Sequence, residues 1–99
     1  MIAHIVMWRL ADTCDDRDAA MRKMAEALRS LPELIPEIRA FEVGYPNLSP
    51  GPAGFDVSLY SRFDSMEALE AYRVHPEHQK VAELIQSLTS ERAVVDYEA

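Results

Sequence analysis

The sequence predicts an α+β fold of the ferredoxin-like type, in which helices cover one face of a four-stranded antiparallel sheet. β-branched and aromatic segments with period-two alternation occur at both ends and in the middle of the chain. Segments of helical periodicity separate them, and prolines and glycines mark the boundaries. The predicted order is β-α-β-β-α-α-β. A chain of 99 residues supports one modest core, so we expect a single domain over residues 1–99.

The segment IAHIVMWRL, residues 2–10, predicts the first strand, because it is rich in β-branched residues and lacks glycine and proline. Alternation places Val6 and Trp8 on the same face as His4. Both faces are largely apolar, which is typical of a strand covered on both sides. The opposite face carries Ala3, Ile5 and Met7.

The first helix is expected to have its N-cap at Asp15 or Asp16, since carboxylates interact favourably with the positive end of the helix dipole. Pro32 ends this helix, because a proline disfavours helical geometry at the residue before it. The residues from Pro32 to Ile38 are expected to form short turns. An amphipathic stripe lies between these limits, at Met21, Met24, Leu28 and Leu31.

Strands are expected over residues 38–45, 55–63 and 92–97, with a proline- and glycine-rich loop over 47–54. Two helices separate the last two strands. Asp64 or Ser65 is expected to cap the first of them. Pro76 ends that helix and starts the next one, with His75 as its N-cap. The apolar stripe of this last helix consists of His78, Val81, Ile85 and Leu88.

Two of the three histidines, His4 and His78, therefore point into the space between the sheet and the helices. A buried imidazole without a hydrogen-bond partner costs roughly 1–3 kcal/mol, so we expect the two rings to approach each other in a partly polar cavity. Tyr72 can bring its hydroxyl to the same place. We expect further contacts from side chains on the inner face of the strands and on the helix that carries Tyr72: Val6, Trp8, Val57, Leu59, Met66 and Leu69.

No metal or cofactor is expected. The chain has neither an HExxH motif nor paired cysteines, because Cys14 is its only cysteine. His75 and His78 lie on either side of a helix start, so their rings need not converge. No haem ligand is recognisable.

The charge balance excludes nucleic acid as the main partner. Seventeen acidic against ten basic residues give a net charge of −7, whereas phosphate binding needs a basic surface. An acidic chain also avoids anionic membranes, and no apolar run is long enough for a membrane span. The N-terminal segment lacks a signal peptide's features, so we expect a cytoplasmic protein.

The sheet face that the helices leave bare is expected to form a homodimer interface, because an apolar patch of this size on a small protein usually marks one. Its side chains would be Ala3, Ile5, Met7, Tyr60, Val95 and Tyr97.

The segment AYRVHPEHQKV, residues 71–81, resembles the tyrosine–two residues–HPxH signature of the stress-responsive α/β-barrel (Dabb) family. The opening IAHIVMWRL resembles the first strand of that family, with its histidine at His4. LIPEI and VVDY also fit, so the resemblance covers the whole chain. It implies a ferredoxin-like protomer and a dimer whose two sheets form an α+β barrel.

One plant branch of that family, the olivetolic-acid-cyclase type, closes a linear polyketide without a cofactor. The resemblance implies that His78 is the general base, that Tyr72 assists at the oxyanion, that His4 supports the pocket and that Asp96 matches a pocket aspartate. Two pocket residues of that branch differ here: Val57 replaces a histidine and Ala27 replaces a tyrosine.

Two hypotheses follow. In the first, the chain is a small enzyme acting on an aromatic or polyketide-like carbonyl compound, with His78 removing a proton and His4 holding the tautomer of His78. In the second, it is a non-catalytic dimeric module that acts in stress tolerance or binds a hydrophobic ligand. An open cavity at His4, Tyr72 and His78 favours the first hypothesis, and a filled space favours the second.

Overall fold

The computed structural model describes every residue from Met1 to Ala99. Its strands are β1 (Ile2–Leu10), β2 (Ala40–Gly44), β3 (Val57–Phe63) and β4 (Thr89–Glu98). Its helices are α1 (Arg17–Arg29), α2 (Leu31–Leu34), α3 (Met66–Val74) and α4 (Pro76–Leu88). The predicted order of elements is confirmed, with the short helix α2 added to it.

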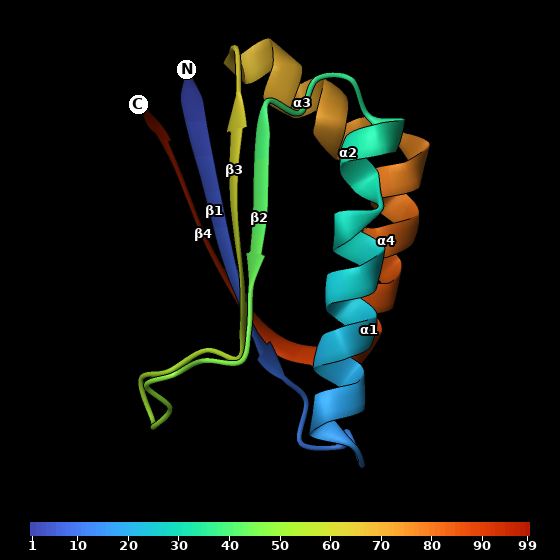
Figure 1. Cartoon of the computed structure of the whole chain (residues 1–99), viewed down its shortest axis with the longest axis vertical. Coiled ribbons are helices and arrows are strands. Elements are labelled where there is room, and N and C mark those ends of the chain that lie inside the picture. Colours follow the sequence, from blue (N-terminus) through green and yellow to red (C-terminus); the bar gives the residue numbers. More distant parts are fainter.

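The four strands form one antiparallel sheet in the order β2-β3-β1-β4. All the helices lie on one side of this sheet, as Figure 1 shows with the sheet nearly edge-on. The ferredoxin-like α+β class predicted from the sequence is therefore correct. β1 is a central strand and β4 is an edge strand, so a side chain on β1 lies deep between the layers and one on β4 lies near an opening.

The predicted helix caps are present. The Asp16 carboxylate accepts a hydrogen bond from the Ala19 amide at 3.0 Å, and the Ser65 hydroxyl accepts one from the Ala68 amide at 3.1 Å. Each satisfies a backbone N–H that has no partner inside its helix. The caps fix where α1 and α3 begin and therefore which faces the two helices turn to the sheet.

Several boundaries differ from the sequence prediction, and β2 spans Ala40–Gly44 rather than residues 38–45. Pro32 lies in the first turn of α2, where its missing N–H costs nothing, so it begins a helical turn as well as ending α1. β3 begins at Val57 rather than Phe55, because the Asp56 carboxylate binds the Leu10 amide at 2.8 Å. β4 begins at Thr89, earlier than expected, and the register shifts opposite Arg9 and Leu10. This irregularity lies beside the cavity described below.

The open face of the sheet carries partly exposed apolar side chains. Met7 is 37% exposed, Val95 51% and Tyr97 47%. Ala3, expected in the same patch, is fully buried because it lies between its larger cross-strand neighbours Arg62 and Tyr97.

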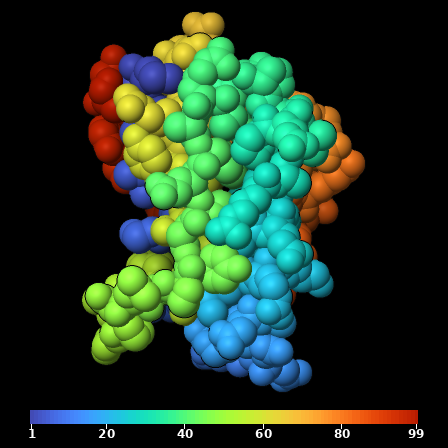
Figure 2. Space-filling model, viewed as in Figure 1, coloured from blue at the N-terminus to red at the C-terminus, as the bar shows by residue number.

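The loop between β2 and β3 stands away from the body of the molecule (Figure 2). No helix has the length and apolar character needed to span a membrane.

Candidate active site

The break between α3 and α4 positions the central part of the site. Pro76 cannot continue α3, and His75, with extended backbone, becomes the N-cap of α4. Its Nδ1 accepts a hydrogen bond from the Glu77 amide at 3.1 Å. Tyr72 thereby lies in the last turn of α3 and His78 in the first turn of α4. Their ring centroids are 4.4 Å apart.

The same break sets the tautomer of His78. In an unbroken helix the Glu77 amide would bind the Arg73 carbonyl, but here the His75 side chain takes that amide. The Arg73 carbonyl instead lies 3.0 Å from Nδ1 of His78. A carbonyl can only accept, so Nδ1 carries the proton. In the neutral ring, Nε2 of His78 then holds a lone pair.

His4 is fixed by an ion-paired carboxylate. Its Nδ1 lies 2.5 Å from Oδ1 of Asp96, its cross-strand neighbour on β4. The other oxygen of Asp96 accepts from the Arg73 guanidinium at 2.7 Å. Arg73 therefore orients both imidazoles, His78 through its backbone and His4 through Asp96. Our expectation that His4 holds the tautomer of His78 is wrong, because the Arg73 carbonyl has that role.

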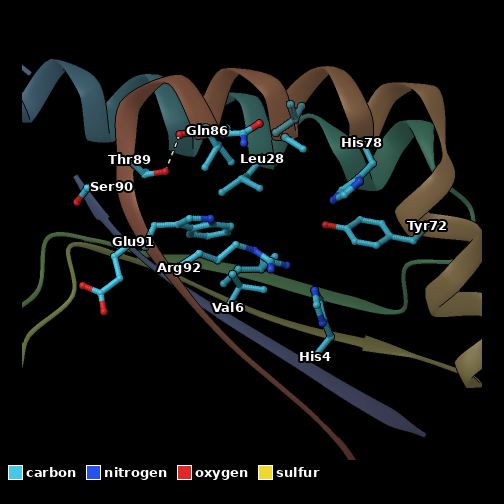
Figure 3. Close-up of a pocket in the computed structure, with 15 residues that line it drawn as sticks. His4, Val6, Leu28, Tyr72, His78, Gln86, Thr89, Ser90, Glu91 and Arg92 are labelled. Atoms are coloured by element: carbon cyan, nitrogen blue, oxygen red, sulfur yellow. Dashed lines mark hydrogen bonds between the residues drawn. The ribbon is translucent and has the colours of Figure 1, made fainter. Parts of the chain in front are cut away.

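Tyr72 lies between the two imidazoles. It is only 1% exposed, and its ring centroid is 6.2 Å from that of His4. In Figure 3 its hydroxyl points into the space between sheet and helices, with His78 reaching from α4 and His4 from β1. No dashed line joins it to another side chain there. A phenol held in this way can donate a hydrogen bond to a ligand oxygen.

These three rings form one end of a cavity of about 440 Å³ between β1, β4 and α4. That volume is within the usual range of small-molecule sites. Exposed residues of α4 and β4, among them Gln86 and Arg92, mark its mouth. The cavity lies beneath the edge strand, so a ligand would enter between α4 and the start of β4. Its walls include Val6, Trp8, Leu28, Leu59, Val81 and Ile85.

Burial tunes the protonation of all three rings. Desolvation lowers the pKa of His4, although the hydrogen bond to Asp96 acts in the opposite direction. Desolvation also lowers the pKa of His78, against the hydrogen bond to the Arg73 carbonyl. Burial raises the pKa of Tyr72 well above its usual range. At neutral pH the imidazoles are therefore neutral and able to accept a proton, while the phenol remains a donor.

Asp96 remains ionised beside His4. Desolvation raises the pKa of this carboxyl, but the hydrogen bond and charge of His4 and the Arg73 guanidinium outweigh it and lower the pKa overall. The pair resembles the carboxylate–imidazole arrangement that fixes a histidine with one nitrogen free.

The structure brings together most of the residues predicted for the site, but not all of them. His4, Tyr72, His78, Val6, Trp8 and Leu59 line the cavity, and Asp96 lies behind His4. Three other predicted contacts do not line it. Met66 is 51% exposed in the first turn of α3, and Leu69 and Val57 are fully buried in the hydrophobic core. Periodicity predicts which face of a helix or strand a residue occupies. It does not predict how far that residue lies from the cavity beneath α4.

Sequence patterns did not indicate that α4 and the start of β4 form one wall of the cavity. Ala82, Gln86 and the run Thr89–Arg92 line it there, and Leu28 lines it from α1. The last strand was expected to start at residue 92, so most of this run lay outside the predicted strand and was not assigned to a face of the sheet. Alternation along β4 places Arg92 on the same face as Asp96, which was the one available signal.

No group of three or more histidine, cysteine, aspartate or glutamate side chains is placed to hold a metal ion. The two cavity histidines already use Nδ1 for Asp96 and for the Arg73 carbonyl. The chemistry that this site offers is therefore that of neutral imidazoles and a phenol: accepting a proton and donating hydrogen bonds.

The fold and the site define a ferredoxin-like α+β protein with an imidazole-lined cavity between its sheet and its helices. The chain belongs to the stress responsive A/B barrel domain family, whose model matches residues 2–99. It is 31% identical over 98 residues to an uncharacterized protein of Streptomyces coelicolor, covering 99% of both chains.

Solved structures agree with this membership. A dimeric protein of unknown function from Bacteroides fragilis, with a ferredoxin-like fold, has a TM-score of 0.84 and 34% identity. The match covers 99% of this chain and 95% of that one. A hydroxynitrile lyase from Passiflora edulis has a TM-score of 0.82 and 20% identity, covering 97% of this chain and 90% of the other. At that identity the lyase supports the fold alone.

Proposed function

We propose that the cavity of this protein binds a small aromatic or polyketide-like carbonyl compound and that His78 removes a proton from the carbon beside the carbonyl. The observation that carries this proposal is the free Nε2 of a neutral His78 next to an unpaired Tyr72 hydroxyl, at the end of an open cavity. A base and an oxyanion donor side by side are the two groups that enolate formation requires.

In this mechanism Nε2 of His78 takes the proton, and the electron pair of the broken C–H bond moves onto the carbonyl oxygen. Tyr72 donates a hydrogen bond to the enolate oxygen formed. His4, held by Asp96, presents its own Nε2 as a further polar group at the same end of the cavity. The imidazolium of His78 then returns the proton to carbon. Alternatively, the enolate carbon attacks a second carbonyl of the same molecule, and the imidazolium gives its proton to the alkoxide that forms on that carbonyl's oxygen. No cofactor takes part.

The open cavity supports a ligand site over a filled structural cluster. Its wide apolar wall also favours a second candidate function, the binding of a hydrophobic ligand without a reaction. The two functions differ in one measurable property, proton exchange at carbon.

Proton exchange at the methyl group of acetophenone or phenylacetone, followed by NMR in deuterium oxide, tests the proposal. Both ketones are neutral and small enough for the cavity. We expect the protein to accelerate deuterium uptake above the buffer rate. Binding of the ketones, seen as a thermal shift, without faster uptake would reject the enzyme proposal in favour of the binding function.

The pH dependence of this exchange follows from the lowered pKa of His78. The base must be neutral, and protonation inactivates it as the pH falls. Because desolvation disfavours the charged form, we expect the acid limb of the rate profile to have its midpoint below about 6.5, the ordinary histidine value. A midpoint above that value would contradict the assignment of His78 as a buried base.

We also propose that two copies of the chain pack through their open sheet faces. Val95 and Tyr97 are about half exposed on a face that no helix covers. The Bacteroides fragilis protein is described as dimeric. A two-fold arrangement covers the same apolar patch on both copies.

Val95→Glu is expected to convert the dimer into a monomer, because two carboxylates would be buried near a two-fold interface. Light scattering at micromolar concentration measures the change in mass. Val74→Glu is the matched control, since Val74 is similarly exposed, at 57% against 51% for Val95, but lies on α3, away from the open face. A monomeric wild-type protein, or an unchanged mass in Val95→Glu, would refute the interface.

A further inference from the structure

Arg92 is a cation at the mouth of the cavity without an anionic partner. It lines the cavity, and in Figure 3 its guanidinium extends from β4 toward the end where His4 and Tyr72 lie. It takes part in none of the salt bridges of the chain. Those involve the basic side chains of His4, Arg9, Arg17, Arg39, Arg73 and Lys80.

The nearby carboxylates are all engaged elsewhere. Asp96 is paired with His4 and with Arg73, at 2.5 and 2.7 Å. Glu91, which also lines the cavity, accepts from Nε of Arg9 at 2.8 Å. With both histidines neutral, Arg92 is the one charged side chain of the lining that has no partner of opposite charge, because Glu91 is paired with Arg9. An unpaired cation at the cavity of a chain with net charge −7 is not explained by the overall composition.

The charge of Arg92 reaches the three rings of the site. It lowers the pKa values of His4, His78 and Tyr72, in each case as a smaller effect than desolvation. Figure 3 places Arg92 between the run Thr89–Glu91 at one end of the cavity and the three rings at the other. A ligand group bound to the guanidinium would therefore hold the rest of the molecule against Tyr72 and His78.

We propose that Arg92 is a specificity-determining residue that binds the carboxylate of the ligand, so that the substrates of this site are carbonyl compounds bearing a carboxylate. This inference rests on the proposed function for the identity of the reacting group but not for the binding. A guanidinium matches a carboxylate with two parallel hydrogen bonds. One cation neutralises one carboxylate, whereas a phosphate dianion would leave an uncompensated charge.

Calorimetric titration with 4-acetylbenzoate and with its neutral analogue 4-acetylbenzamide tests the proposal. The two probes share size, ring and ketone and differ in one charge. We expect the wild-type protein to bind the benzoate about tenfold to hundredfold more tightly, the range of a charge-assisted hydrogen-bonded contact. Arg92→Gln should lose this preference, and Arg92→Lys should keep part of it, because it retains the charge but not the planar fork.

Arg22→Gln is the matched control. Arg22 is exposed on α1, outside the cavity, and its removal changes the net charge equally. Retention of the preference in Arg92→Gln, its loss in Arg22→Gln, or no preference in the wild type would overturn the proposal, as would failure to bind either probe at millimolar concentration.

The neutral ketones used for the exchange assay separate this proposal from the proposed function. If the protein catalyses exchange but shows no preference for the carboxylate, the role of Arg92 is refuted and the proposed function stands. A carboxylate preference without exchange would support Arg92 as the anchor of a binding protein and reject the reaction.

Discussion

His78→Ala should reduce protein-catalysed deuterium uptake by acetophenone by about 10²- to 10⁴-fold, the usual contribution of a positioned general base. Tyr72 and His4 would remain, so the variant loses the proton acceptor and keeps the rest of the wall. The cavity left by the imidazole also allows a direct test of the role, because free imidazole added to the buffer should restore part of the rate.

Gln79→Ala is the control for this variant. Gln79 follows His78 on α4, is exposed and does not line the cavity, so its truncation should change stability by no more than about 0.5 kcal/mol, with little effect on exchange. Equal exchange rates in wild-type protein and in folded His78→Ala, with the thermal transition measured for each, would remove His78 from the mechanism.

The second large effect is expected in the core beneath the site. Phe63→Ala should lower the free energy of unfolding by about 3–5 kcal/mol, the range for truncating a buried aromatic. Phe63 is fully buried, with its ring centroid 4.9 Å from that of Tyr72 and 6.3 Å from that of His4. A domain of this size has only about 5–15 kcal/mol in total, so the variant will be close to unfolding at 37 °C.

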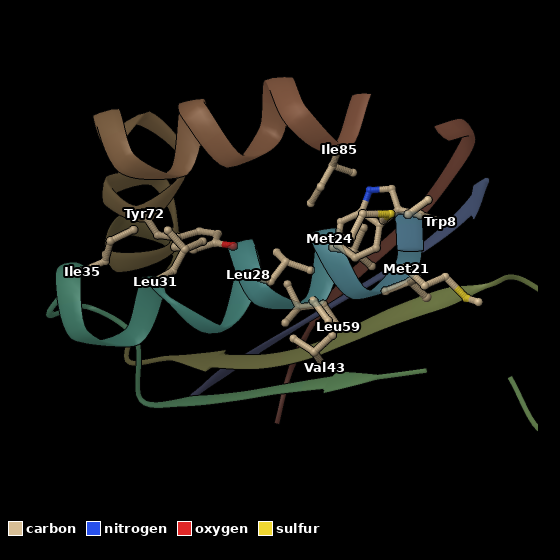
Figure 4. Packing of buried hydrophobic residues seen from close by; sticks show 14 of the residues in the cluster. Trp8, Met21, Met24, Leu28, Leu31, Ile35, Val43, Leu59, Tyr72 and Ile85 are labelled. Carbon is tan, nitrogen blue, oxygen red and sulfur yellow. The ribbon is translucent and has the colours of Figure 1, made fainter. Parts of the chain in front are cut away.

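Figure 4 shows the layer in which this loss occurs, with Met24 and Leu28 of α1 facing Leu59 of the sheet. Urea unfolding followed by circular dichroism measures the change. Leu48→Ala is the control, because Leu48 is 92% exposed and its truncation should change stability by no more than about 0.5 kcal/mol. A loss below 1 kcal/mol in Phe63→Ala would show that this ring is not part of the packed core.

The sequence predicted the order of the elements and the direction of their inward faces well, because both depend on local properties. The limits of β1 and the caps of α1 and α3 agree with the structure. Helix ends follow from capping side chains and from proline, and these act within a few residues. The family signature HPxH has the same local basis, since His75 caps, Pro76 breaks the helix and His78 follows in the first turn.

The candidate site was predicted only in part. Strand and helix faces brought His4, Tyr72 and His78 into one space, and the structure places their rings together. The same reasoning added Met66 and Leu69, which share the helix of Tyr72, yet one is exposed and the other is packed in the core. The face of a helix or strand tells only the direction in which a side chain points. Whether that side chain lines the cavity depends on how far each element extends and on the angle at which the helices cross the sheet.

The sequence by itself determined the fold class, the two inward-facing histidines and the helix break at Pro76, because each depends on the identity and spacing of neighbouring residues. The tertiary structure alone decided that Arg73 orients both imidazoles and that Arg92 lies unpaired in the cavity. These results depend on β4 pairing with β1 across most of the chain length, since the register of that pairing fixes which charges meet and which remain free.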